Sequence, residues 1–329
     1  MNLSEKFRLY SGLFHSFLKQ FVSEKEKLSP CSLYEPEIYV LQSGGKRLRP
    51  LISLWACDML SGKPEKALPV AAAIELFHNF TLVHDDIMDD APSRRGRPTI
   101  HTKWNIPLAI LCGDLMLIHA VQQLLHQENH KDIIFRIFLE TAEGICQGQQ
   151  MDMEMEKSEN ADLNSYLNMI RKKTAILLGC SMQTGAIAGG MNPRESDVLF
   201  EWGCQNGICF QLQDDVLDVF GDENVTGKIK GGDLIRGKKS LPYILADLSL
   251  KDKAHAEWEN FKKLSPELRK EKILFIINLL EQEGIREVCE KKINDSFERA
   301  EHLTQKIPLG ENQRQELRDF SEYLFSRKN

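Results

Sequence analysis

Residues 80–89 read FTLVHDDIMD, an acidic cluster inside an apolar run. Asp85 and Asp89 are four residues apart, so a helix would place their carboxylates on one face, one turn from each other. Apolar neighbours such as Leu82 and Ile87 predict that most of this helix is buried. Neighbouring carboxylates are tolerated where they face water or where a hard cation such as Mg²⁺ bridges them. One such cluster fits a solvated acidic face and a metal site equally well.

The cluster has a second copy further along the chain. Residues 212–220 read LQDDVLDVF, and Asp214 follows Asp85 by 129 residues. Asp214 and Asp218 again lie one helical turn apart. Neither segment has the alternating ligands and central glycine of an EF-hand calcium loop. Nothing else in the sequence repeats convincingly, so we predict two matching carboxylate sites and not a solenoid.

Basic residues accompany both acidic clusters. Arg94 and Arg95 follow the first, and Lys228 and Lys238 follow the second. Carboxylates that hold Mg²⁺, together with Arg and Lys donors, form a container for a polyphosphate. A separate basic stretch, residues 44–50 (GGKRLRP), has glycines that permit close backbone approach. On its own this stretch is typical of a loop.

The rest of the chain predicts a helical protein. No proline lies between Pro107 and Pro193, and apolar residues in this interval recur at three- and four-residue spacing. Gly and Pro in residues 61–64 and 189–193 indicate helix breaks. The acidic, methionine-rich run 151–156 alternates locally, but its residues are helix formers. We expect a single all-α domain covering residues 1–329.

Composition limits the partners. The formal net charge of −6 argues against nucleic acid or an anionic membrane surface as the main partner. The most apolar window, Pro107–Ala120, contains Asp114 and is shorter than the roughly 20 residues of a membrane span. We therefore expect a cytoplasmic protein without a membrane span. The eight cysteines form no CxxC pair and are expected to be buried free thiols, with no disulfide between Cys204 and Cys209.

The complete set of motifs resembles the trans-isoprenyl diphosphate synthases, also called polyprenyl synthetases. The resemblance covers roughly residues 40–245 in correct order and spacing, and a chance agreement of seven motifs is negligible. It is most similar to the short-chain geranylgeranyl and farnesyl diphosphate synthases. The motifs are GGKRLRP, DDIMD, RRGRPT, GQQMD (148–152), Lys173-Thr174, Phe210-Gln211 with DDVLD, and GKIKGGDLIRGKKSLP from Gly227.

The resemblance implies a Mg²⁺-dependent prenyltransferase that joins isopentenyl diphosphate to an allylic diphosphate and releases diphosphate. It also implies the isoprenoid synthase fold, a bundle of long antiparallel helices around a central cavity, paired as a homodimer. Three Mg²⁺ ions, which Mn²⁺ can replace, would bind the allylic diphosphate. Their protein ligands would be Asp85, Asp89 and Asp214, with Asp86, Asp215 and Asp218 acting behind them or through water.

The same resemblance assigns the basic and polar residues. The metal-free site for isopentenyl diphosphate would consist of Lys46, Arg49, His78 and Arg95. Direct bonds to the allylic diphosphate would come from Arg94, Lys173, Lys228 and Lys238. The carbonyl groups of Lys173 and Thr174 and the amide oxygen of Gln211 would face the carbocation. The proton lost at the end would pass to the released diphosphate.

Chain length is the property on which the family members differ. In this family the residues just before the first DDxxD form the floor of the pocket that holds the growing chain. In this sequence those residues are Phe80 and Thr81. A bulky Phe80 should stop elongation early, so we expect a C20 product, with C15 as the alternative. Thr81 lies nearer the Asp85 face on an ideal helix, so either side chain fits the role of floor.

Two other functions compete with this assignment. A class I terpene cyclase ionises the same substrates, but it normally carries one DDxxD and needs no isopentenyl site. A non-catalytic subunit of a heteromeric synthase typically loses the acidic motifs. This chain keeps both DDxxD motifs and GGKRLRP, which favours the synthase.

Overall fold

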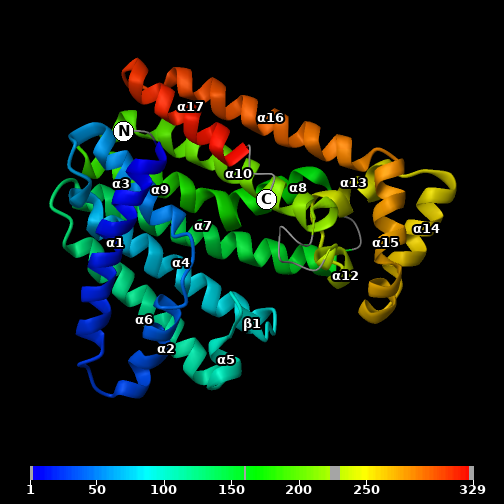
Figure 1. Ribbon diagram of the computed structural model, residues 1–329, viewed down its shortest axis with the longest axis horizontal. Coiled ribbons are helices and arrows are strands. Elements are labelled where there is room, and N and C mark those ends of the chain that lie inside the picture. Colours follow the sequence, from blue (N-terminus) through cyan, green and yellow to red (C-terminus); the bar gives the residue numbers. More distant parts are fainter. Residues whose placement is uncertain (1–2, 159–160, 223–229, 326–329) are drawn as a thin grey trace. The chain divides into compact units, whose positions relative to one another are not determined.

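The structure, a computed structural model, describes residues 3–158, 161–222 and 230–325 (Figure 1). Helices form almost all of this part of the chain, which confirms the all-α prediction. Its strands are β1 (Ser93–Arg94) and β2 (Arg97–Pro98), which pair as an antiparallel hairpin. The helices are α1 (Leu3–Lys25), α2 (Cys31–Leu41), α3 (Leu48–Ser61), η1 (Pro64–Ala67), α4 (Leu68–Met88), α5 (Ile100–Lys103), α6 (Ile106–Leu125), α7 (Lys131–Lys157), α8 (Leu163–Ile170), η2 (Arg171–Ala175), α9 (Ile176–Ala188), η3 (Pro193–Glu195), α10 (Asp197–Phe220), α12 (Gly232–Arg236), α13 (Leu241–Ser249), α14 (Asp252–Lys262), α15 (Pro266–Gln282), α16 (Ile285–Lys306) and α17 (Glu311–Phe325).

The chain divides into two compact units. Unit 1 comprises Met1–Leu139 and Cys180–Asp197, and unit 2 comprises Glu140–Gly179 and Val198–Asn329. The first acidic cluster therefore belongs to unit 1 and the second to unit 2. The organisation of residues 1–329 as one domain stays a prediction.

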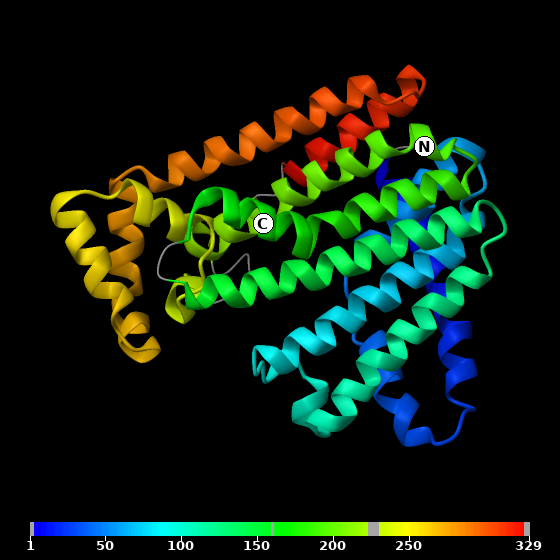
Figure 2. The ribbon, with the colours of Figure 1, turned by 180° about the vertical axis from the view of Figure 1, so that it is seen from behind.

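In unit 1, α4 and α6 run side by side (Figures 1 and 2). They approach closely because α6 has a glycine where the helices meet. A Cβ atom at Gly113 would lie 2.2 Å from Nε2 of His84, the residue before Asp85. The His84 ring also lies 3.2 Å, through Nε2, from the carbonyl oxygen of Ile110. The end of α4 that carries the first acidic cluster is thus fixed against α6.

In unit 2, the second acidic cluster lies in the last turns of α10. Two glycines let α10 pack against the backbone of the segment before it. A Cβ atom at Gly207 would lie 2.7 Å from Cα of Ala175, and one at Gly203 would lie 2.7 Å from Cα of Gly179. Helix α10 also packs into a core with α13, α14, α15 and α16. The largest buried side chain of this core is Trp258 of α14. The packing holds α10 firmly beside η2.

The helix breaks lie where the sequence predicts them. Helix α3 ends at Ser61, and Gly62 follows it in the left-handed conformation, with φ of 63°. Helix α9 ends at Ala188, and Pro193 begins the short η3. The methionine-rich run 151–156 lies inside α7, which confirms its interpretation as helix.

Two expectations need correction. All eight cysteines are free, but Cys31 and Cys146 are exposed, because they lie on the solvent faces of α2 and α7. Helix α6 continues beyond the window expected from the sequence and reaches 20 residues with a mean hydropathy of 1.7. Within the described residues, it is the one helix with the length and composition to cross a bilayer. This is weak support for a membrane span, since core helices of soluble proteins can have the same length and apolar composition.

Candidate active site

The first acidic cluster occupies the C-terminal end of α4. Asp85 is half-buried and Asp89 is exposed, and the two are one helical turn apart. Asp86 is buried and accepts a hydrogen bond from Nε of Arg94 at 2.7 Å. Burial raises the pKa of Asp86, and the Arg94 guanidinium opposes that rise. Asp86 therefore holds a protein partner, while Asp85 and Asp89 lie toward the surface of this helix end.

Two adjacent arginines in the hairpin after α4 bind different partners. Arg94 bonds Asp86, whereas Nη1 of Arg95 donates to the carbonyl oxygen of Gly44. Arg95 has φ of 54°, in the left-handed region, and its guanidinium packs on Gly45, where a Cβ atom would lie 2.8 Å from Cζ. The chain reversal at the hairpin thus separates Arg94, beside the acidic cluster, from Arg95, beside the GGKRLRP loop.

Arg95 joins a basic cluster at the start of α3 and the middle of α4. Nη1 of Arg49 lies 3.3 Å from Nε2 of His78. Burial lowers the pKa of His78 well below its usual value, and Arg49 and Arg95 lower it further, so the imidazole is neutral. The structure therefore brings together three of the four residues predicted to bind isopentenyl diphosphate. The fourth, Lys46, is exposed on the adjoining loop.

A buried carboxylate that sequence reasoning missed lies beneath this cluster. Glu75 is 2% exposed and bonds Nη1 of Arg47 at 3.0 Å and Nδ2 of Asn79 at 3.0 Å. Its negative charge offsets the positive charges of Arg49 and Arg95. The available signal was a lone charge in the apolar run VAAAIELF of α4, since a buried charge needs a partner.

The second acidic cluster contains one deeply buried carboxylate. Asp215 is 3% exposed and accepts hydrogen bonds from the Tyr166 hydroxyl at 2.5 Å, the Leu241 amide at 2.9 Å and Nε2 of Gln211 at 2.9 Å. Burial raises its pKa. Asp218 is also buried and accepts from the backbone amide of Asp233 at 2.8 Å. Asp214 is half-buried.

The bond to Asp215 also orients Gln211. Because its Nε2 donates to Asp215, the amide oxygen of Gln211 points away from that carboxylate. The role of this oxygen as a dipole facing the carbocation stays a prediction. Tyr166 and Leu241, which complete this arrangement, carry no signal in the sequence because they lie 49 and 26 residues from Asp215.

Lys173 and Thr174 lie in η2, a π-helical turn. A π turn replaces the hydrogen bonds between residues four apart by bonds between residues five apart. Such turns often lie at functional sites, because some backbone carbonyls lose their usual helical hydrogen bond. Helix α7 approaches this turn through Gly148, where a Cβ atom would lie 2.3 Å from the Lys173 amide nitrogen. The side chain of Lys173 bonds Asp152 of the GQQMD motif at 2.5 Å.

Lys238 lies in the same acidic surroundings. Burial lowers its pKa, but Asp233, Asp215 and Asp152 together outweigh that effect and raise it to about 12. The ammonium group is therefore charged at neutral pH. Lys228, the other predicted lysine, lies outside the described residues.

Of the two predicted chain-length residues, Phe80 belongs to a row of aromatic rings that meet at tilted or edge-on angles. The Phe80 ring centroid lies 5.4 Å from that of Phe77 and 4.8 Å from that of His84. Phe77 in turn lies 5.4 Å from Phe138 of α7 and is buried. The Thr81 hydroxyl donates to the carbonyl oxygen of His78 at 2.8 Å. Phe80 is therefore half-buried and lies between Phe77 and His84 in a row of rings.

The carboxylates fit a Mg²⁺ ion that shares its coordination with phosphate and water better than they fit a metal ion held by protein side chains alone. Across residues 3–158, 161–222 and 230–325, no group of three or more His, Cys, Asp or Glu side chains is placed to hold a metal ion. Proteins usually bind Mg²⁺ through one or two carboxylates, with phosphate and water completing the octahedron. Asp85 and Asp89, paired on one helix face beside Arg94, match this requirement for oxygen donors.

Replacement of Asp215 by alanine is expected to destabilise the protein. The change leaves the buried Tyr166 hydroxyl and Leu241 amide without their acceptor, which costs about 2–4 kcal/mol in the free energy of unfolding. Denaturant unfolding followed by circular dichroism measures this loss. Asp214→Ala, on the same helix but half-buried, is the matched control and should lose less than about 1 kcal/mol. Equal losses in the two variants would contradict a structural role for Asp215.

Known proteins resemble this chain over most of its length. The family model described as polyprenyl synthetase matches residues 30–277. The chain is 40% identical over 231 residues to a short chain isoprenyl diphosphate synthase of Methanocaldococcus jannaschii, covering 70% of this chain and 69% of the relative. It is 41% identical over 231 residues to a geranylgeranyl diphosphate synthase of Saccharolobus solfataricus, covering 68% of each. A crystal structure of a geranylgeranyl pyrophosphate synthase superposes with a TM-score of 0.92 at 35% identity, covering 100% of both chains.

Proposed function

The chain belongs to the polyprenyl synthetase family, and on that premise we propose that it is a geranylgeranyl diphosphate synthase. It condenses isopentenyl diphosphate with C5, C10 and C15 allylic diphosphates to the C20 product and releases diphosphate. Relatives at about 40% identity carry this activity in their names, and the chain shares the isoprenoid synthase fold with the solved synthases. Farnesyl diphosphate, the C15 product, is the alternative.

The observation that carries the proposal is the separation of Arg94 from Arg95. One arginine stands beside the aspartates of the first DDxxD, and its neighbour stands with Arg49 and His78. This arrangement suits two diphosphates bound in different ways, one next to a metal-binding carboxylate pair and one by basic side chains alone. A condensing enzyme requires two such sites, whereas a cyclase requires one.

The residues of the allylic site are proposed from the motifs that the chain shares with its family. Asp85, Asp89 and Asp214 would hold Mg²⁺, three ions in all, and Mn²⁺ can substitute because it accepts the same oxygen ligands. Bound Mg²⁺ would stabilise the negative charge that develops on the departing diphosphate. Arg94, Lys173, Lys228 and Lys238 would donate charge-assisted bonds to the same group. The site for isopentenyl diphosphate would consist of Lys46, Arg49, His78 and Arg95.

The carbocation needs negative dipoles and no base from the protein. Carbonyl oxygens of Lys173 and Thr174 in the π turn and the amide oxygen of Gln211 supply those dipoles. Asp215 and Tyr166 act as positioning residues, because they hold the Gln211 amide by its nitrogen. Fixed dipoles stabilise a developing charge at no reorganisation cost during the reaction. The proton released at the end passes to the diphosphate.

The family activity can be tested with the full chain. Purified protein is incubated with isopentenyl diphosphate, Mg²⁺ and each of the C5, C10 and C15 primers, and product lengths are resolved by chromatography. We expect C20 from all three primers and no product in excess chelator. A C15 end product selects the alternative. Equal condensation in excess chelator would contradict the metal-dependent mechanism.

We further propose that two copies pair through α6. This helix exposes a strip of large apolar side chains: Ile106, Ile110, Leu111, Ile118 and Leu125, each at least 44% exposed. Such a strip marks an interaction surface, and a twofold pairing buries the same face on both copies. Pairing also accounts for the apolar composition of α6 without a membrane. The cytoplasmic location stays a prediction.

Charged substitutions on this strip should abolish the dimer. Leu111→Glu with Ile118→Glu places two like charges on each copy at the contact, so we expect a monomer by light scattering coupled to size-exclusion chromatography. Leu248→Glu, at an equally exposed leucine of α13, is the control and should leave the dimer intact. A dimeric double variant would place the interface elsewhere.

A further inference from the structure

The buried carboxylate of Glu75, in the middle of α4, lies beside three arginines of unit 1: Arg47, Arg49 and Arg95. Its Oε1 accepts a hydrogen bond from Nη1 of Arg47 at 3.0 Å. Burial raises the pKa of this carboxyl group, and the charges of Arg47, Arg95 and Arg49 oppose that rise. Arginine stays charged in proteins, and its charge favours the ionised form of a neighbouring carboxyl group. Glu75 is therefore the counter-ion of this arginine cluster.

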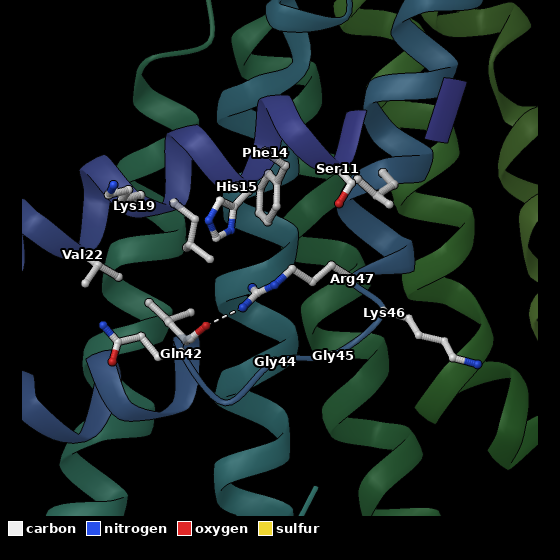
Figure 3. A pocket seen from close by; sticks show the side chains of 13 residues that line it. Ser11, Phe14, His15, Lys19, Val22, Gln42, Gly44, Gly45, Lys46 and Arg47 are labelled. Carbon is white, nitrogen blue, oxygen red and sulfur yellow. Dashed lines mark hydrogen bonds between the residues drawn. The ribbon is translucent and has the colours of Figure 1, made fainter. Parts of the chain in front are cut away.

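Arg47 is held by protein groups at both of its terminal nitrogens. Nη1 bonds Glu75, and Nη2 donates to the carbonyl oxygen of Leu41 at the end of α2 (Figure 3). Figure 3 shows the Lys46 side chain pointing in the opposite direction from that of Arg47. The Arg47 side chain is also 18% exposed, so little of it faces solvent. Arg47 can therefore influence a bound diphosphate through its charge, while its hydrogen bonds stay with the protein.

Arg49 and Arg95 have neutral hydrogen-bond partners instead. Nη1 of Arg49 lies 3.3 Å from the neutral His78 imidazole, and Arg95 donates to the carbonyl oxygen of Gly44. The buried Nε of Arg49 has no acceptor in the part of the chain that the structure describes. Burial lowers the pKa of both guanidinium groups, and Glu75 is the acid that opposes this most. The charges of Arg49 and Arg95 are thus balanced mainly by Glu75 across a distance.

The cluster keeps a net positive charge in spite of its counter-ion. Three arginines and one carboxylate give 3 − 1 = 2 positive charges, and His78 adds none because it is neutral. A diphosphate adds negative charge beside the same arginines, so it competes with Glu75 for them. In such partly buried surroundings, a change of one charge in the cluster is expected to alter the affinity for a diphosphate by about tenfold.

We propose that Glu75 sets the affinity of this site for isopentenyl diphosphate, because it is the counter-ion that the diphosphate replaces. In the empty site Glu75 offsets the repulsion among the three arginines. When the diphosphate binds, Arg49 and Arg95 contact it, while Arg47 stays with Glu75. Glu75 and Arg47 act through those two arginines and are positioning residues. The identity of the ligand rests on the proposed function, whereas the charge balance does not.

Two neutralising substitutions should move the affinity in opposite directions. Isopentenyl diphosphate is titrated into the full-length protein by isothermal calorimetry, in excess chelator so that only metal-free binding is measured. Glu75→Gln adds one net positive charge to the cluster and should lower Kd by about tenfold. Arg47→Gln removes one and should raise Kd by about tenfold. Damage to the fold would weaken binding in both variants, so shifts of the same sign, or no shifts, overturn the proposal.

The double variant should restore the balance. Arg47→Gln with Glu75→Gln again leaves two positive charges, on Arg49 and Arg95, so Kd should return to within about threefold of wild type. A double variant that binds as weakly as Arg47→Gln alone would show structural damage and overturn the proposal. Should Arg47→Gln fail to fold, Glu75→Gln decides alone. Tighter binding then supports the proposal, and equal or weaker binding overturns it.

Glu37→Gln is the matched control for the loss of a buried carboxylate. Glu37 is also in unit 1 and is 0% exposed, but its Oε1 lies 2.8 Å from Nδ1 of His119 on α6. The substitution should lower the melting temperature, as Glu75→Gln does, because each removes a buried ionic partner. It should leave Kd within about twofold of wild type. A tenfold shift in Glu37→Gln would contradict a specific role for Glu75.

Steady-state kinetics separate this inference from the proposed function. Glu75→Gln should lower the KM for isopentenyl diphosphate and leave the KM for farnesyl diphosphate within about twofold, because the allylic diphosphate binds beside the first DDxxD. Equal shifts in the two KM values overturn the proposal. If the chain condenses no prenyl substrates while the opposite shifts in Kd persist, the proposed function fails and the counter-ion stands. If it condenses them while both Kd values shift in the same direction, the counter-ion fails and the function stands.

Discussion

Asp85→Asn and Asp214→Asn are each expected to lower kcat by about 10²–10³-fold, the largest loss we expect from a single isosteric change. Each replaces a carboxylate that we propose as a Mg²⁺ ligand by a neutral amide of the same shape, so the departing diphosphate would lose about 2.7–4 kcal/mol of stabilisation. Steady-state assays at saturating isopentenyl and farnesyl diphosphate, over a series of Mg²⁺ concentrations, measure both kcat and the apparent metal affinity. That affinity should fall along with kcat.

Asp90→Asn is the matched control for this prediction. Asp90 adds a fourth acid beside the first DDxxD, but its side chain is fully exposed, and its carboxylate lies 3.8 Å from His101. It has φ of 48°, a conformation that asparagine tolerates, so the substitution removes charge without straining the backbone. Activity should stay within about twofold of wild type. A large loss in Asp90→Asn, or none in Asp85→Asn, would assign the metal to other carboxylates.

The sequence predicted which acidic residues share a helix face, because that information is local. A four-residue spacing fixes Asp85 and Asp89 on one helix face whatever surrounds them. The spacing does not determine which aspartate of each motif is buried. Asp86 and Asp215 occupy equivalent positions in the two motifs, yet one meets Arg94 of the hairpin and the other meets Tyr166, 49 residues away. These partners depend on tertiary packing, which no local pattern records.

The fold shows the same division between local and distant information. Helix breaks at Gly62 and Pro193 follow from residue chemistry, and the structure confirms them. The π turn at η2 was not foreseen. It depends on one extra residue in a helical turn and on Gly148 of α7, which lets that helix approach the Lys173 backbone. Neither feature changes the apolar periodicity from which helices are predicted.

Phe80→Ala is expected to shift the main product from C20 to C25 or longer. Phe80 is half-buried and lies between Phe77 and His84 in the row of rings, so its truncation opens space one helical turn and a residue from Asp85. Elongation should still be limited, because Phe77 and Phe138 remain behind it at 5.4 Å from each other. Phe80→Ala with Phe77→Ala should therefore extend the product further than either change alone. Chromatography of the products made from farnesyl diphosphate measures the shift.

Thr81→Ala distinguishes the two candidate floors. The Thr81 hydroxyl bonds the carbonyl oxygen of its own helix at His78, so this small side chain is turned back along α4 and its loss opens little space. We expect Thr81→Ala to keep C20 as the main product. If Thr81→Ala lengthens the product and Phe80→Ala does not, the growing chain passes on the Thr81 side of α4. The aromatic row would then support the helix without limiting the chain, and the double Phe variant would lose stability with no change in product length.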